Sequence, residues 1–318
     1  MRILVTGGAG FIGSHIVDGY LAAGHDVTVV DDLSAGAPAN VSRRARFHRA
    51  DVRSGELDAI FAAEQPEIVS HHAAQVSVRR SVEEPIHDAE INVLGSLNLL
   101  ETARRHGVRR VVFASTGGAI YGEMAPGLTA DEAYPCRPQS PYAVAKLAVE
   151  HYLVGYRTAG GLETVVLRYA NVYGPRQDPH GEAGVIAIFI QRIRAGLAPT
   201  IFGDGEQVRD FVYVADVVRA NLLAHAVAVP AGDPLVLNIA TGQGTTVTAL
   251  WRALSEIAHP TVEPHHEPPR AGDLLRSVLD PARAGRVLGW QAHVSLERGL
   301  QQTWAWFDGG VARAGVVA

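Results

Sequence analysis

Cysteine is almost absent from this chain, because Cys136 is the only one in 318 residues. A single thiol cannot form an intrachain disulfide, so a disulfide-stabilised fold is excluded and a reducing compartment is expected. No apolar run approaches the roughly 18 residues that a membrane span needs, and the first residues predict a strand rather than a signal peptide. We therefore expect a soluble, cytoplasmic protein with no membrane partner.

Positive charge is also scarce, with 28 basic against 33 acidic residues and a net charge of -5. No basic stripe is visible, so we expect no nucleic-acid partner. The 14 histidines lack the spacing of a zinc site, and we predict no metal. His265-His266 and Cys136 are interpreted as loop residues without a functional role.

The chain has no internal repeat and no low-complexity segment, and its length predicts one large or two linked lobes. Its first half alternates short apolar runs with helical patterns, which predicts a parallel sheet covered on both faces. We therefore expect an α/β fold with a doubly wound Rossmann sheet and a smaller C-terminal α/β substrate lobe. The predicted strands are 2–7, 25–32, 45–52, 66–74, 109–116 and 163–171, and the predicted helices include 54–64, 87–106 and 141–158.

After about residue 172 this rhythm changes to a loop rich in glycine, proline and charge. A strand, a helix and a second strand near 208–240 are expected to return to the first lobe. The first expected domain is therefore discontinuous, comprising 1–171 with roughly 208–240. The second expected lobe comprises 172–207 and 241–318.

The segment TGGAGFIG follows the first strand and opens the first helix. Gly7 and Gly10 allow a tight turn close to a pyrophosphate, Phe11 and Ile12 begin the helix whose amides bind it, and Gly13 permits close helix packing. Asp31 ends the second strand and is placed to accept hydrogen bonds from the adenosine ribose. A carboxylate at this position repels a 2′-phosphate, so the predicted cofactor is NAD.

Two further strand ends contribute to this predicted site. Asp51 and Val52 close the third strand, where they are expected to meet the adenine. Ala73 and Ala74 end the fourth strand and are small enough to let a dinucleotide pass across the sheet. Ordinary strand-end residues are the alternative interpretation for all four.

The segment SPYAVAK places Tyr142 and Lys146 four residues apart, on one face of a predicted helix. A free tyrosine titrates near about 10. An ammonium roughly 6 Å away would stabilise the phenolate by about two pK units. Tyr142 is therefore a candidate general base for a sugar or alcohol hydroxyl. Thr116, which ends the fifth strand, is expected to hydrogen-bond the same hydroxyl.

These motifs together resemble the extended short-chain dehydrogenases, on the segments TGGAGFIG, HHAAQ, FASTGGAIYG, SPYAVAK and LRYANVYGPR. Within that family, the chain is most similar to the UDP-glucose 4-epimerases and related nucleotide-sugar epimerases, from end to end. The resemblance implies an isomerase in which Tyr142 deprotonates the sugar O4 during transient oxidation at C4 by NAD. It also implies that Tyr169 and Asn92 lie beside the nicotinamide or beneath it, with core packing as the alternative.

The resemblance further implies a UDP-sugar substrate that is bound by the second lobe. Ser277 occupies a position that borders the sugar, where a small side chain leaves room for a 2-acetamido group. UDP-GlcNAc and UDP-GalNAc are therefore expected to fit as well as UDP-glucose and UDP-galactose. The other residues implied in substrate binding are Asn171, Val185, Ile186, Phe202, Arg209, Arg270 and Asp273.

Departures from the family pattern keep alternatives open. Val76 stands where several members carry a lysine, and Gly117 and Gly118 stand where 4,6-dehydratases carry an Asp-Glu pair. A UDP-uronate epimerase or decarboxylase, a dTDP-glucose 4,6-dehydratase and a non-catalytic NAD-binding sensor remain the weaker interpretations. The apolar faces of helices 87–106 and 141–158 predict a homodimer, with burial inside the monomer as the alternative.

Overall fold

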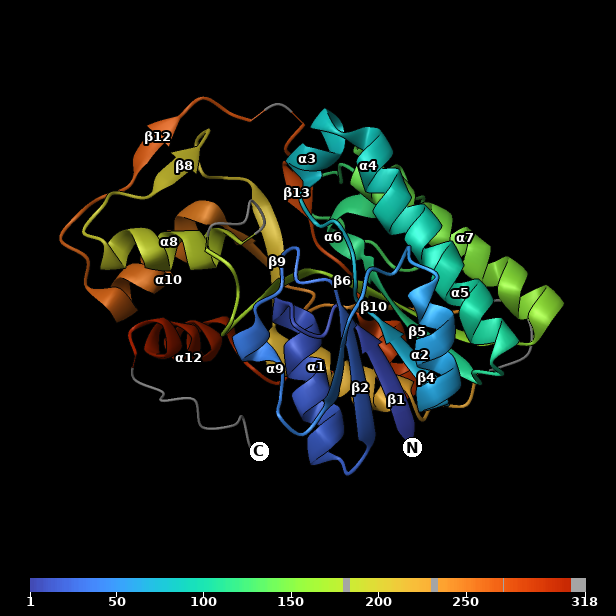
Figure 1. Cartoon of the computed structure of the whole chain (residues 1–318). Coiled ribbons are helices and arrows are strands. Elements are labelled where there is room, and N and C mark those ends of the chain that lie inside the picture. The colour runs from blue at the N-terminus through green and yellow to red at the C-terminus, as the bar shows by residue number, and fades with distance from the viewer. Residues whose placement is uncertain (180–183, 230–233, 271, 310–318) are drawn as a thin grey trace.

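A computed structural model of the chain describes residues 1–179, 184–229, 234–270 and 272–309. Among these residues, seven parallel strands form a central sheet in the order β10-β6-β5-β4-β1-β2-β3 (Figure 1). The sheet confirms the predicted doubly wound α/β fold. Its strands are β1 Arg2–Thr6, β2 Asp26–Asp31, β3 Arg46–Arg49, β4 Ile68–His71, β5 Arg110–Thr116, β6 Glu163–Tyr169 and β10 Leu235–Ile239.

Helices cover both faces of this sheet, because its strands are apolar on both sides. One face carries α1 (Phe11–Ala22), α9 (Val214–Ala224) and α11 (Ala282–Leu288), and α1 packs on α9. The other face carries α2 (Glu56–Glu64), α5 (Ser96–Arg105) and α7 (Pro141–Gly160). The amino end of α7 is fixed by Ser140, whose hydroxyl accepts a hydrogen bond from the amide of Ala143.

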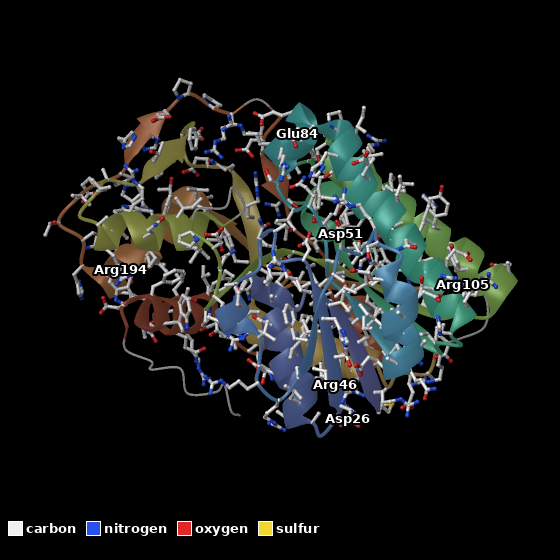
Figure 2. All side chains as sticks on the ribbon, viewed as in Figure 1. Asp26, Arg46, Asp51, Glu84, Arg105 and Arg194 are labelled. Carbon is white, nitrogen blue, oxygen red and sulfur yellow. The ribbon has the colours of Figure 1, made fainter. Side chains whose placement is uncertain are left out.

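The strand order reverses direction between β1 and β4. The chain passes from β1 outward to β2 and β3, then returns to place β4 on the other side of β1. In open α/β sheets, ligands bind beyond the carboxyl ends of the strands at such a reversal. Figure 2 labels Asp26 and Arg46, which open β2 and β3, at the far end of the sheet from Asp51, which follows β3. The predicted site residues therefore lie together at the carboxyl ends of the strands, which form one edge of the sheet.

The predicted helix 87–106 is interrupted. It begins earlier as α4 (Pro85–Ala89), continues as one π-helical turn, η2 (Glu90–Gly95), and ends as α5. A short helix, α3 (Val78–Glu83), precedes it and was not predicted. A π-helical turn widens the helix by one residue per turn and is frequent at functional sites. Here it contains Asn92, whose side chain is buried. The remaining short elements are η1 (Pro38–Asn40) and α6 (Gly117–Ile120).

The predicted strand 163–171 is also divided. β6 ends at Tyr169, and β7 (Asn171–Tyr173) leaves the central sheet to pair with β9 (Val208–Tyr213). The break follows Ala170, whose amide is bound by the carbonyl of Ile239. β9 also pairs with β11 (Gly244–Thr246) and β13 (Arg276–Ser277) in a four-stranded sheet. Asn171 therefore begins the second sheet.

The second lobe surrounds this smaller sheet (Figure 1). Its apolar core is formed by α8 (Val185–Arg194), α10 (Val247–Ala258) and α12 (Leu296–Phe307). β8 (Thr200–Phe202) pairs with β12 (His265–Glu267) at its margin. Of the segment 208–240, β10 joins the central sheet, whereas β9 does not. The division into two domains stays a prediction. No helix of the described residues is long and apolar enough to cross a membrane.

Candidate functional site

The glycine turn after β1 is constrained at each of its predicted positions. Gly7 has a φ of 67°, and a Cβ there would lie 2.6 Å from the amide nitrogen of Ala73. A Cβ on Gly13 would lie 2.1 Å from the carbonyl oxygen of Gly7. Gly10 precedes the first turn of α1, which contains Phe11 and Ile12, and no side chain caps this helix. Only glycine at position 7 allows the turn to lie so close to the loop after β4, and only glycine at position 13 allows α1 to lie so close to the turn.

Asp31 ends β2 and is buried beside this turn. Its Oδ2 accepts a hydrogen bond of 2.9 Å from the amide of Ala9, and its Oδ1 accepts one of 2.8 Å from the amide of Leu33. Burial raises the pKa of this carboxyl, and the two amide bonds partly reverse the effect. Each carboxylate oxygen has a second lone pair, so Asp31 can still accept hydrogen bonds from ribose hydroxyls.

The other predicted strand-end residues lie along the same edge. Asp51 forms an ion pair of 2.6 Å with Arg53, whose hydrogen bond holds the pKa of the Asp51 carboxyl below its usual range. Val52 is buried beneath it. Ala73 and Ala74 follow β4, and the amide of Ala73 donates to the hydroxyl of Thr6 at 3.1 Å.

A dinucleotide fits these residues. The first three amides of an α-helix have no acceptor within the helix, and α1 offers them beside a glycine turn without a capping side chain. The nearest atom to a Cβ built on Gly10 is the Gly7 carbonyl, at 3.2 Å, so no side chain crowds this position. Backbone amides at a helix N-terminus bind phosphate groups. Asp31 would bind the adenosine ribose.

The predicted catalytic residues converge at the end of β5. Thr116 ends this strand, while Tyr142 and Lys146 lie on the first two turns of α7. The Nζ of Lys146 lies 6.0 Å from the centre of the Tyr142 ring and donates a 3.0 Å hydrogen bond to the carbonyl of Ala114. Only 4% of Lys146 is exposed. The three side chains therefore act on one small volume beside the loop after β4.

The electrostatics of this cluster differ from the expectation that Lys146 lowers the pKa of Tyr142. Burial raises the pKa of the Tyr142 phenol, the charge of Asp88 raises it further, and a hydrogen bond from Thr116 lowers it. Burial also lowers the pKa of Lys146 to about 8, against the charges of Asp88 and Glu150. Burial is therefore the largest effect on the pKa of both groups.

Lys146 has a second distinction that the motif alone does not reveal. It is the only lysine in the sequence, since 27 of the 28 basic side chains are arginines. Arginine and lysine are both suitable on a solvent-exposed surface. A chain that uses arginine everywhere else and lysine here indicates that this position needs a compact ammonium with three donors.

A buried network lies directly beneath these residues. Arg168 on β6 forms an ion pair of 2.6 Å with Glu150, one turn after Lys146 on α7. The hydroxyl of Ser115, the neighbour of Thr116, donates to the same carboxylate. Arg168 also donates to the Tyr121 hydroxyl at 2.8 Å. The network links β5, β6 and α7, and the sequence analysis did not identify it.

Asn92 and Tyr169 lie at the two sides of the loop after β4. The Oδ1 of Asn92 accepts from the amide of Gln75, and its Nδ2 donates to the Gln75 carbonyl, both at 3.0 Å. The Tyr169 ring stacks on His72 with 6.3 Å between ring centres, and its hydroxyl accepts from Asn221 on α9 at 2.8 Å. Both residues therefore hold this loop from beneath the edge of the sheet.

In the second lobe, four of the residues implied in substrate binding lie in two pairs, and two others open a helix. Arg209 on β9 lies 3.6 Å from Asp273. The guanidinium of Arg270 lies 3.7 Å from the centre of the Phe202 ring. Val185 and Ile186 open α8, which has no side-chain cap at its amino end.

The two remaining residues implied in substrate binding, Ser277 and Asn171, meet at Gly118, close to the catalytic residues. Ser277 on β13 is paired in register with Arg209, and its hydroxyl donates to the Gly118 carbonyl at 3.4 Å. The Oδ1 of Asn171 lies 3.5 Å from the position that a Gly118 Cβ would occupy. Gly118 follows Thr116 by two residues, so these side chains face the cluster at the end of β5.

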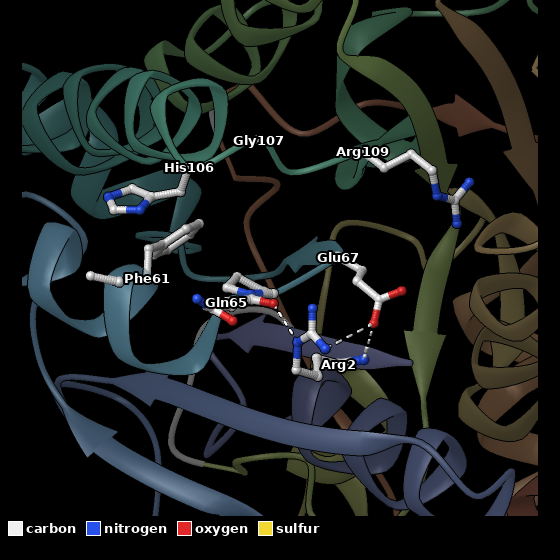
Figure 3. A pocket seen from close by; sticks show the side chains of 9 residues that line it. Arg2, Phe61, Gln65, Glu67, His106, Gly107 and Arg109 are labelled. Atoms are coloured by element: carbon white, nitrogen blue, oxygen red, sulfur yellow. Dashed lines mark hydrogen bonds and ion pairs between the residues drawn. The ribbon is translucent and has the colours of Figure 1, made fainter.

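A cavity of about 600 Å³ lies at the opposite edge of the sheet (Figure 3). Its guanidinium groups are already paired, since Arg2 lies 3.7 Å from Glu67 and Arg109 lies 3.2 Å from Glu163. It contains none of the predicted site residues. Across the described part of the chain, no three His, Cys, Asp or Glu side chains are grouped so as to hold a metal ion.

Comparisons with known proteins agree with this geometry. The chain is 47% identical over 312 residues to the UDP-glucose 4-epimerase of Mycolicibacterium smegmatis, covering 96% of this chain and 98% of that protein. It superposes on UDP-glucose 4-epimerase from Thermotoga maritima with UDP-glucose at a TM-score of 0.94 and 51% identity, covering 98% of this chain and 99% of that one. The Thermus thermophilus UDP-glucose 4-epimerase complex with NAD gives a TM-score of 0.93 and 49% identity, covering 98% and 100%. Residues 3–240 match the NAD dependent epimerase/dehydratase family, and the chain belongs to that family.

Proposed function

We propose that the chain is a UDP-glucose 4-epimerase, an isomerase that inverts C4 of a UDP-linked hexose. The observation that carries this proposal is the convergence of Thr116, Tyr142 and Lys146 beside the glycine turn of a dinucleotide site. The family match and the full-length similarity to UDP-glucose 4-epimerases support the same activity. NAD is the cofactor of this family, as the sequence predicted.

Each catalytic side chain has a role that follows from its position. Tyr142 takes the proton of the sugar O4 and returns it after inversion. Thr116, its hydrogen-bond partner, orients the same hydroxyl. Lys146 stabilises the phenolate and, with two ammonium protons beyond its bond to Ala114, can bind ribose hydroxyls of the cofactor. Bound NAD supplies the acceptor and donor of the C4 hydride.

The cofactor-binding roles are proposed for the residues along the sheet edge. The turn at Gly7, Gly10 and Gly13 would hold the pyrophosphate with the amides of α1, and Asp31 would hold the adenosine ribose. The further residues proposed to line the cofactor are Phe11, Ile12, Asp51, Val52, Ala73, Ala74, Asn92 and Tyr169.

A dehydratase is disfavoured by the packing of Gly117. A Cβ at this position would lie 2.3 Å from the Cδ1 of Leu279, which is buried. The first carboxylate of the acid–base pair that a 4,6-dehydratase needs, at position 117, therefore cannot be accommodated without moving Leu279. Removal of water across C5 and C6 requires a general acid and a general base.

The substrate-binding roles follow from charge and position. Arg209 and Arg270 would bind the diphosphate, since guanidinium groups match phosphate oxygens. Phe202 would face the uracil once Arg270 moves from its ring, and Asp273 would bind the ribose. Asn171 and the α8 amides at Val185 and Ile186 would complete the pocket.

The test uses purified protein, which is incubated with UDP-galactose with and without added NAD while the anomeric proton signals are followed by NMR. We expect conversion to UDP-glucose that is abolished in Tyr142→Phe. Tyr152→Phe, an exposed tyrosine on the same helix, is the matched control and should retain activity. No conversion in the presence of NAD would refute the proposal.

Ser277 sets the proposed acceptance of N-acetylated sugars. It is buried and its hydroxyl reaches only the Gly118 carbonyl, at 3.4 Å. Ser277→Tyr should selectively abolish conversion of UDP-GalNAc while UDP-galactose is still converted. Unchanged selectivity would rule out this role.

We also propose a homodimer formed through α3, α4, η2 and α7, which pack side by side along one flank of the molecule (Figure 1). This flank exposes apolar side chains that a monomer would leave in water, namely Val82, Ile86, Leu94, Val144 and Tyr152. Ile86→Glu should yield a monomer in sedimentation experiments. Leu197→Glu, an equally apolar exposed site on the other lobe, should not.

The proposed cytoplasmic location rests on Cys136, a free thiol with no second cysteine in the sequence.

A further inference from the structure

Asp88 is a buried carboxylate that the proposed reaction does not use. It lies on α4, and only 1% of it is exposed. Its Oδ1 accepts two hydrogen bonds of 2.9 Å, from Nε2 of Gln75 and Nδ2 of Asn92. Its Oδ2 is buried and has no hydrogen-bond partner among the described residues. A buried charge of this kind is costly unless another group compensates it.

The Oδ1 bonds join three segments at the edge of the proposed cofactor site. Gln75 belongs to the loop after β4, which also contains Ala73 and Ala74. Asn92 belongs to the π-helical turn and is bound twice more to the backbone of Gln75. Asp88 therefore fixes the side-chain amide of Asn92 in one orientation, because a carboxylate oxygen of Asp88 can accept a hydrogen bond only from the NH₂ group of that amide.

The charge of Asp88 acts on the ammonium of Lys146. α4 packs against α7, and the ammonium of Lys146 is buried on α7 with one hydrogen bond of 3.0 Å, to Ala114. Two carboxylates act on Lys146, and Asp88 has the larger effect, ahead of Glu150. Glu150 is already bound by Arg168 and Ser115. The charge of Glu150 is thus compensated by Arg168, whereas the charge of Asp88 remains available to Lys146.

We propose that Asp88 is a positioning residue of the active site, fixing Asn92 and Gln75 through Oδ1 while Oδ2 provides the counter-charge of the Lys146 ammonium. The catalytic part of this inference rests on the proposed epimerase function. The electrostatic part does not, because it concerns the charge state of one lysine.

The other polar groups around the pair do not replace this charge. His71 and His72 on the β4 side are kept neutral, since burial and the charge of Lys146 lower the pKa of each. Burial raises the pKa of the Asp88 carboxyl, and Lys146 and His87 act against that rise. Tyr142, which lies on the same face of α7 as Lys146, is protonated in this environment because burial and Asp88 raise its pKa.

Removal of the Asp88 charge therefore has a defined direction. Asp88 raises the pKa of Lys146 against the effect of burial, so its loss lets that pKa fall further. Asp88 also raises the pKa of Tyr142, so the loss lowers that value too. Both limbs of a pH–rate profile should move to lower pH. A merely structural defect would lower the rate at every pH without moving the limbs.

The single lysine makes the charge state directly measurable. Lysine labelled with ¹³C at Cε gives one side-chain signal from this chain, whose midpoint can be followed by NMR against pH. Asp88→Asn keeps the size of the side chain and an acceptor for Gln75 and Asn92. Two unit charges roughly 10 Å apart at an effective dielectric of about 20 shift each other by about one pK unit, so the Lys146 midpoint of this variant should fall by about one pH unit.

The matched control is Glu84→Gln, which removes an exposed carboxylate four residues before Asp88, at the N-cap of α4. Its midpoint should stay within about 0.2 units of wild type, because exposed charges are screened. Equal midpoints in Asp88→Asn and wild type would overturn the proposal. If Asp88→Asn does not fold, Asp88→Ser tests the same loss of charge. A wild-type midpoint at the ordinary lysine value would overturn the proposal without any variant.

The activity arm separates this proposal from the proposed function. If the protein converts UDP-galactose, the pH–rate profile of Asp88→Asn should move with the Lys146 midpoint. If the protein converts no UDP-sugar but the midpoint moves as expected, the epimerase proposal fails while the Asp88–Lys146 pairing stands. A shifted midpoint with an unshifted profile would refute the role of Asp88 in the reaction.

Discussion

Breaking the buried pair of Glu150 and Arg168 should destabilise the protein more than any loss of a surface ion pair. Both side chains are less than 10% exposed, and their closest atoms lie 2.6 Å apart. Glu150→Gln would leave the buried Arg168 guanidinium without a counter-charge, since the Tyr121 hydroxyl at 2.8 Å, the Glu132 carbonyl at 3.5 Å and the new amide oxygen are all neutral acceptors. Removal of one partner from a buried pair costs about 3–5 kcal/mol, because the other charge stays uncompensated.

The same reasoning predicts a rescue. Replacement of both members by methionine, which has similar volume, removes the uncompensated charge. Such replacements are often neutral, and sometimes stabilise the protein. The double variant Glu150→Met with Arg168→Met should therefore be more stable than Glu150→Gln by about 2 kcal/mol or more. Glu84→Gln, from an exposed pair with 2.9 Å between Glu84 and Arg80, should cost no more than about 0.5 kcal/mol.

Urea unfolding at 25 °C, followed by tryptophan fluorescence and circular dichroism together, measures these differences. Coincidence of the two signals would justify a two-state analysis of a protein with two lobes. A cost below about 1 kcal/mol for Glu150→Gln would mean that water reaches the guanidinium, which contradicts its burial. A double variant less stable than either single variant would show that packing, rather than charge, dominates this network.

Two other predictions concern the glycine turn and the buried histidine His15. Gly13→Ala should weaken NAD binding at least about tenfold in calorimetry, because its Cβ would lie 2.1 Å from the Gly7 carbonyl and open the turn; unchanged affinity would contradict this. Burial, then the charge of Arg176, lowers the pKa of His15 to about 4. Below about pH 6.5, His15 therefore binds a proton in the unfolded chain but not in the folded protein. The free energy of unfolding should then fall as the pH is lowered from about 6.5 to about 4. His15→Gln should reduce that slope by about 1.4 kcal/mol per pH unit, and an unchanged slope in urea unfolding would refute the assignment.

The parts of the site that the sequence predicted are those that depend on local spacing. The glycine turn, Asp31 and the pair of Tyr142 and Lys146 each lie within one turn or at one strand end, where periodicity and chain direction determine position. The parallel sheet followed for the same reason. The sequence also predicted the return of β10, because its apolar run matched a central strand.

The parts that the sequence analysis missed depend on packing between distant segments. Asp88 has no motif, and its role arises only because the π-helical turn at Asn92 and the packing of α4 on α7 bring it to Lys146. The pKa of Tyr142 was predicted in the wrong direction for a related reason. Spacing gives the distance to Lys146, whereas the cost of burial depends on everything that surrounds both groups.

Burial explains why the active site needs carboxylates that never touch the substrate. The buried guanidinium of Arg168 stays charged whatever its surroundings, so Glu150 must pair with it directly. A buried ammonium can instead lose its proton, and the pKa of Lys146 is already lowered by burial to about 8, close to neutral pH. One unshared carboxylate nearby is then enough to decide whether the group is charged when the reaction needs it. Asp88, with one oxygen bound and the other free, meets that requirement while leaving the donors of Lys146 available to the cofactor and to Tyr142.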